Sequence, residues 1–136
     1  MYKNADVTIF NKYFDPLQGV DRYQRTQIEG VYWDASYGAS IRKTGMESEN
    51  KVLVLIPFED NDELFCKPKE FERLPAEERA DHWTLKPGDK IVRGLIHHDG
   101  TMVTLLQNYD DVYEITTVDT KDMGSYDMQH WEVMAK

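Results

Sequence analysis

Short segments in which apolar and polar residues alternate, separated by turn residues, limit most strongly what this chain can fold into. Strand-like stretches occupy residues 5–14, 23–33, 51–58, 82–85, 90–96, 111–120 and 127–134. Such alternation is the pattern of a strand with one buried face. Turns rather than full helices separate most of these stretches. The pattern therefore predicts a mainly β fold, a small β-barrel or sandwich of six or more short strands.

Two strand segments carry additional information. In residues 23–33, Gln27 and Glu29 are in phase with Val31 and Trp33, so the apolar face changes sides near Gly30. A β-bulge at this glycine would explain the change. Residues 51–58, KVLVLIPF, form an unbroken apolar run, which predicts a central strand covered on both faces.

One to three short helical insertions are expected between the strands. Pro68 and Pro75 stand where a proline opens a helix, so helices are expected over residues 68–74 and 75–79. Thr101 fits an N-cap for a helix over residues 101–109. Because these helices are short and no linker divides the chain, a single β-rich domain over residues 1–136 is expected.

Residues 35–50 interrupt the strand pattern. They are polar, contain glycine and show little periodicity beyond a short strand at residues 40–43. A long, mobile loop or the tip of a hairpin is expected there.

The charge of the chain argues against tight binding to nucleic acid. The net charge is −9, and residues 47–136 carry twenty acidic and ten basic groups, against five and six in residues 1–46. Such a surface repels phosphates and lacks the basic footprint that supplies most nucleic-acid affinity. Solubility alone is the simpler interpretation of the same charge.

No pattern for catalysis, metal binding or a cofactor is found in the sequence. The adjacent pair His97 and His98 would point to opposite faces of a strand, so the two rings could not share one ion. The acidic residues 59–63 lack the ligand spacing of a calcium loop and are interpreted as a solvated tip. Cys66 has no recognisable histidine partner motif and cannot form an internal disulfide. A non-enzymatic protein without cofactor or metal is therefore expected.

A membrane location is not expected either. Residues 1–10 show no basic region followed by an apolar stretch, and the longest apolar run, residues 52–56, is far too short to cross a bilayer. Cytoplasmic synthesis is the expectation.

Five phrases follow one another over nearly the whole chain: VTIFNKY, GVYWDASYGASIRKTGMESENKVLVLIPF, CKPKEFERL, HWTLKPGDKIVRGLI and DDVYEITTVDTKDMGSYDMQHWEV. Taken together, these phrases resemble small proteins from the structural modules of tailed phages and prophages of Gram-positive bacteria. The turn with Leu85, Gly88 and Asp89, which opens a strand, is similar to one in head-closure, or head–tail joining, proteins. The helices inserted at residues 68–79 make this chain longer than a minimal protein of that class.

The resemblance implies a virion protein, made in the cytoplasm of the bacterial host, that forms a ring between the portal-adaptor and the tail. An acidic lumen would repel the DNA backbone and let the genome pass. The expected contacts with neighbouring subunits involve six residues: Tyr32, Trp33, Tyr37, Ile41, Arg42 and Lys43. The four apolar or aromatic members would anchor the interface. The basic pair would contact an acidic neighbour or the DNA backbone.

Simpler roles and other functions stay open from the sequence. Tyr32 and Trp33 could belong to the core, and Arg42 and Lys43 to a solvated loop. A tail-terminator, or another minor capsid or tail component, is the alternative within the same particle. A monomeric ligand-binding β-barrel is the alternative from another class, and it would require a concave apolar pocket with converging polar groups.

Overall fold

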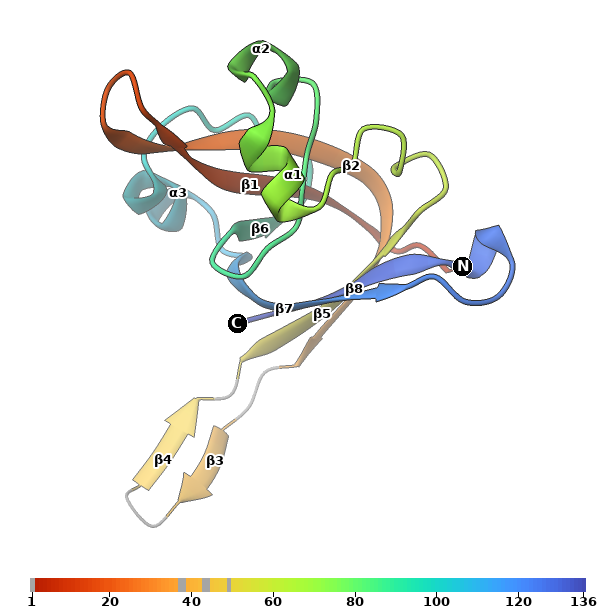
Figure 1. Ribbon diagram of the computed structural model, residues 1–136. Helices are drawn as coiled ribbons and strands as arrows, with labels where there is room; N and C mark the ends of the chain where they lie inside the picture. Colours follow the sequence, from red (N-terminus) through yellow and green to blue (C-terminus); the bar gives the residue numbers. More distant parts are fainter. Residues whose placement is uncertain (1, 37–38, 43–44, 49) are drawn as a thin grey trace.

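A closed antiparallel barrel forms the body of the protein. The computed structural model describes residues 2–36, 39–42, 45–48 and 50–136, with the backbone alone for residue 36 and for residues 39–42 and 45–48. Within them, six strands close the barrel in the order β1-β2-β5-β8-β7-β6 (Figure 1). These are β1 (Ala5–Asp15), β2 (Val20–Ser36), β5 (Lys51–Pro57), β6 (Lys90–Arg93), β7 (Val112–Lys121) and β8 (His130–Ala135). The mainly β fold and the barrel are thus confirmed.

A second, smaller sheet lies between β2 and β5 in the chain. Here β3 (Ala39–Arg42) and β4 (Gly45–Ser48) pair antiparallel with each other. Figure 1 shows this hairpin extending away from the barrel. We call β3 and β4 the arm. Of the two expectations for this segment, the described residues therefore match the hairpin.

Strand β2 connects the two sides of the barrel because it is long and bends. Its first part pairs with β1, whereas Tyr32–Ser36 pair with Lys51–Leu55 of β5. Between these parts the register slips, since Ala5 is opposite Val31 while Val7 is opposite Ile28. Gly30 lies in the slip with a φ of +79°, a conformation that side chains rarely adopt. The bulge expected at this glycine is confirmed.

The barrel interior is filled with side chains from all six strands. Its largest cluster includes Val7, Ile9, Val54, Ile56 and Val133, each with no solvent exposure or nearly none. At one end, Phe65 and Trp83 from the β5–β6 connection pack on Trp131, with ring centroids 4.3 and 5.3 Å from it. This connection therefore closes one mouth of the barrel with aromatic rings.

In the described part of the chain, three short α-helices lie outside the barrel: α1 (Pro68–Arg73), α2 (Ala76–Arg79) and α3 (Met102–Asn108). Pro68 stands at the start of α1 as expected, and Phe71 is the side chain that α1 buries. The Thr101 side chain accepts the Thr104 N–H at the start of α3, which confirms the N-cap. Leu105 of α3 packs with Phe10 and Val92 on the outside of β1 and β6. A single turn of 3-10 helix, η1 (Tyr126–Met128), precedes β8.

Three sequence expectations need correction. Residues 82–85 are not a strand, because only an isolated bridge joins Trp83 to Phe65. Trp83, Thr84 and Leu85 are all buried, because this segment closes the barrel mouth. The strand expected over residues 90–96 ends at Arg93, where Gly94 takes a φ of +100°.

The third correction concerns β5. Its side chains alternate between buried positions, such as Val52 and Val54, and half-buried ones, such as Leu53 and Leu55. One face therefore packs in the core and the other is only partly covered, although the unbroken apolar run suggested that both were covered.

Candidate interaction surfaces

The turn that carries the resemblance, residues 85–89, is held by a buried polar cluster. The Asp89 carboxylate is fully buried and accepts hydrogen bonds from the Lys12 N–H at 3.0 Å, Asn11 Nδ2 at 2.7 Å and Lys86 Nζ at 2.5 Å. Lys86 also supplies the opposite charge that a buried carboxylate needs. The Asp89 backbone C=O accepts the Ile115 N–H from β7. This aspartate therefore joins the turn to both β1 and β7.

Asn11 completes the cluster from the β1 side. Its Nδ2 group donates to the Thr84 C=O at 2.7 Å as well as to Asp89, and its Oδ1 accepts the Thr84 N–H at 3.2 Å. Both polar faces of the amide are thus used inside the protein. The motif with Leu85, Gly88 and Asp89 fixes the barrel in this chain, since Asp89 is buried and Leu85 is a core residue.

The six expected interface residues are distributed between the core and the arm. Trp33 is buried, 4% exposed, with its ring edge-on to Tyr113 at 5.6 Å. Tyr32 points the other way, is half-buried and contacts the Tyr2 ring at 6.2 Å. Trp33 is therefore a core residue here, and Tyr32 is the one that reaches the surface.

The remaining four belong to the arm region. Ile41 and Arg42 lie in β3, where Ile41 is opposite Met46 and Arg42 is opposite Gly45 of β4. Tyr37 and Lys43 lie outside the described residues. The register places Arg42 in the last pair of this hairpin, at the end of β3 that is distant from the barrel strands.

A groove with acidic walls lies beside β2, and we call it the acidic groove. It encloses about 420 Å³ between residues 25–28 of β2, the loop at residues 60–64 and residues 80–83. Three exposed carboxylates line it, those of Asp60, Glu63 and Asp81. None of them forms an ion pair with another described residue. The basic group in the wall, Arg25, is already paired with Asp99 at 2.9 Å.

Sequence reasoning missed this groove. The acidic residues 59–63 were interpreted as a solvated tip, and nothing local connects them to residues 25–28 or 80–83. The one available signal was the concentration of negative charge in the second part of the chain. Asp62, in the same acidic tip, is engaged differently from the groove carboxylates. It forms a hydrogen bond with the Tyr126 hydroxyl, and this bond raises the pKa of that tyrosine.

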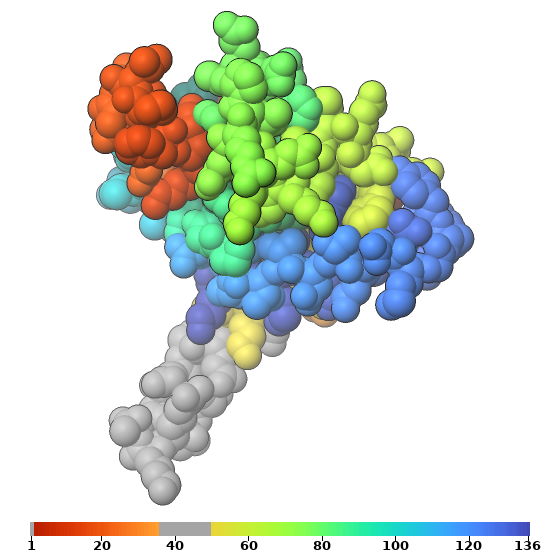
Figure 2. Space-filling view, in the orientation of Figure 1, coloured from red at the N-terminus to blue at the C-terminus, as the bar shows by residue number. Residues whose placement is uncertain are grey.

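Apolar side chains are also exposed near the β1–β2 turn and on α3. Figure 2 shows the β1–β2 turn, in red, projecting from one corner of the body. Phe14, Leu17 and Val20 of this turn are 58%, 95% and 46% exposed, and Val103 and Leu106 of α3 are 65% and 56% exposed. A cleft lined by Tyr13, Tyr23 and Met102, among others, separates the two. The salt bridge of Asp15 with Arg22 at 2.7 Å braces the turn, and its hydrogen bond lowers the pKa of Asp15.

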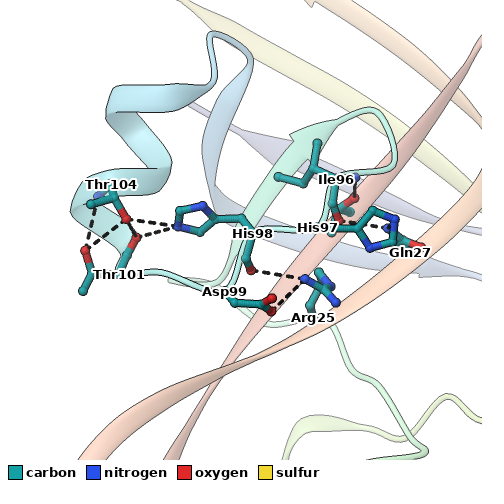
Figure 3. Close-up of polar contacts among 9 residues, drawn as sticks. Arg25, Gln27, Ile96, His97, His98, Asp99, Thr101 and Thr104 are labelled. Carbon is teal, nitrogen blue, oxygen red and sulfur yellow. Dashed lines mark hydrogen bonds and ion pairs between the residues drawn. The ribbon is translucent and has the colours of Figure 1, made fainter.

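The histidine pair lies in the connection between β6 and α3 (Figure 3). The His98 ring points to α3, with Nε2 2.9 Å from the Thr101 C=O, while the His97 ring points the other way, to Gln27. Arg25 of β2 holds this connection by donating to the His98 C=O and the Asp99 carboxylate. Arg25 and Gln27 therefore fasten this connection to the barrel, and the two histidine rings do not converge on one point.

The described residues contain no group of three His, Cys, Asp or Glu side chains close enough to hold a metal ion. Cys66 is buried, and burial together with the nearby charge of Glu70 raises the pKa of its thiol, which makes it a weak nucleophile. No helix in the described part of the chain is long and apolar enough to cross a membrane.

The fold and these surfaces define a class: a small closed β-barrel that carries a hairpin arm and a buried aspartate turn. The chain belongs to a family of unknown function, DUF6751, which matches residues 2–136. No curated protein matches this chain. No solved structure matches it either.

Proposed function

We propose that this protein is a non-enzymatic structural component of a phage or prophage virion at the head–tail junction. Copies assemble into a ring that connects the portal-adaptor to the tail and lets DNA pass. The observation that carries the proposal is the resemblance of the sequence phrases, together with an arm that extends from a closed barrel. A projecting hairpin has strand edges that a neighbouring copy can pair with. The barrel interior is filled with side chains, so a binding function belongs to the outer surface.

The charge distribution is consistent with this role. The net charge of −9 belongs mainly to residues 47–136, and the carboxylates of the acidic groove form no ion pair with a cation among the described residues. A ring built from such subunits presents negative charge to DNA, so the genome slides without adhering.

The test is the mass of the purified chain by light scattering across concentration, alone and mixed with the proteins encoded beside it. The expected result is a ring of copies or a defined complex with a portal-adaptor or tail protein. A chain that stays monomeric at every concentration and ignores every neighbour would contradict the proposal and favour the ligand-binding barrel.

A variant without the arm provides the matched comparison. Ser36 and Lys51 are paired across β2 and β5, so an Asn-Gly turn in place of residues 37–50 can join them in a tight hairpin. The barrel pairs remain, and thermal unfolding should change little. Assembly should be lost, and a ring that forms equally well without the arm would remove the arm from the proposal.

A further inference from the structure

β1 pairs with one edge of β2, and the opposite edge has few strand partners among the described residues. On this opposite edge β5 pairs only with Tyr32–Ser36, and no described strand pairs with residues 20–31. The barrel nevertheless closes, because β2 bends at its bulge. Residues 25–28 of this open edge form one wall of the acidic groove. An open strand edge inside a groove is a template for an additional strand.

The register indicates which backbone groups point into the groove. Lys12 donates its N–H to Asp89, away from β2, so its partner Tyr23 belongs to a non-hydrogen-bonded pair. Because the two kinds of pair alternate along the strands, Arg25 opposite Phe10 and Gln27 opposite Thr8 are also non-hydrogen-bonded pairs. Their N–H and C=O groups are therefore directed to the open edge. Their side chains are occupied elsewhere, with Asp99 and the Ile96 C=O.

The arm has the complementary properties. Its strand β3 pairs only with β4 in the described residues, so β3 has an open edge of its own, four residues long. The open edge in the groove also spans four residues, a length of about 14 Å for a strand. In sequence, β3 ends at Arg42, and Lys43 follows, so the strand carries positive charge toward its end. The groove walls carry the three unpaired carboxylates.

We infer that β3 of one copy adds to the open edge of β2 in the next copy, within the acidic groove. The inference rests on the proposed ring and specifies its subunit contact. Main-chain hydrogen bonds join the two edges, and Glu63 and Asp81 attract the basic end of the neighbour's arm. Because the arm and the groove are different surfaces, the contact is head-to-tail, and it closes into a ring when the rotation between copies allows it.

The experiment is a charge swap in the full chain. A groove variant carries Glu63→Lys and Asp81→Lys, both at exposed positions, and an arm variant carries Arg42→Glu and Lys43→Glu. Each alone should weaken self-association at least about tenfold, since like charges then face each other. Mixing the two variants should restore assembly, because every arm then meets a groove of opposite charge. Asp60 is left unchanged, since its φ is +69°.

A control variant separates the effect of charge in the groove from the effect of net charge on association. Asp119→Lys with Asp122→Lys adds the same charge at exposed positions outside the groove lining and should leave association unchanged. Circular dichroism and thermal unfolding of every variant show whether the barrel is intact. Carbodiimide cross-linking of a mixture of light and isotope-labelled chains should join arm and groove peptides from different copies.

The outcomes separate this inference from the proposed function. Weakened variants that recover on mixing support the contact. A ring that both reversals leave intact, or variants that do not recover on mixing, overturn the contact and leave the proposed ring in place. A groove reversal that abolishes binding of a neighbouring protein but not self-association assigns the groove to that protein and also overturns the inference. A wild-type chain that is monomeric under all conditions overturns both.

Discussion

Replacing Asn11 by alanine should destabilise the barrel more than replacing an exposed asparagine by alanine does. The Asn11 amide is fully buried and makes three hydrogen bonds, two to the Thr84 backbone and one to the Asp89 carboxylate. Alanine leaves the Thr84 N–H buried without a partner, which costs about 1–3 kcal/mol. It also removes a charge-assisted bond to Asp89, worth about 1.5–3 kcal/mol. Together these terms give a loss of about 2.5–6 kcal/mol in the free energy of unfolding.

Urea unfolding followed by tryptophan fluorescence measures this loss directly, since Trp83 is adjacent to Thr84 and buried. For a chain of this size the midpoint of thermal unfolding should fall by about 10–20 °C. Asn108→Ala, at an exposed position at the end of α3, is the control and should change stability by less than about 0.5 kcal/mol. A loss below about 1 kcal/mol for Asn11→Ala would refute the argument that this cluster stabilises the 85–89 turn.

Three further predictions concern single groups. Arg22→Gln should raise the pKa of Asp15, which NMR titration measures. The contact with Arg22 lowers the pKa of Asp15 in the folded protein. It therefore stabilises the turn at a pH above the pKa of Asp15 in the unfolded chain, and this stabilisation is lost as the pH falls through the pKa of Asp15 in the folded protein. An unchanged Asp15 pKa would contradict the role of Arg22. Iodoacetamide should label Cys66 at least about tenfold more slowly in the native protein than in urea, and equal rates would mean the thiol is accessible. Gly30→Ala should cost about 1–2 kcal/mol in urea unfolding, since φ is +79° and a Cβ would lie 2.9 Å from the Lys3 side chain; a neutral result would show that the bulge relaxes.

Much of the barrel could be predicted from the sequence because its strands are locally encoded. The alternation in residues 5–14 and 111–120, the glycine at the bulge and the Thr101 cap each act within a few residues. The false strand at residues 82–85 shows where this reasoning fails. Trp83, Thr84 and Leu85 are all buried, and the rings that pack on Trp83 belong to Phe65 and Trp131, which are distant in sequence.

The surfaces were predictable to a smaller extent. The polar, glycine-containing segment between two strands could be recognised from its composition. Trp33 and Tyr32 could not be told apart as interface residues from the sequence, and the barrel buries Trp33. The acidic groove depends on three separate segments and on an edge that β5 leaves unpaired, and no local pattern contains that information.

The position of β8 in the barrel determines when a growing chain can fold. This strand comes after the other five barrel strands in the chain, yet it lies between β5 and β7 and pairs with both. A nascent chain still lacking residues 130–135 therefore has two unpaired strand edges and an open core, and its contacts between distant residues favour slow closure. Folding must then follow translation of β8, and a fragment ending before it has no finished barrel with which to enter an assembly.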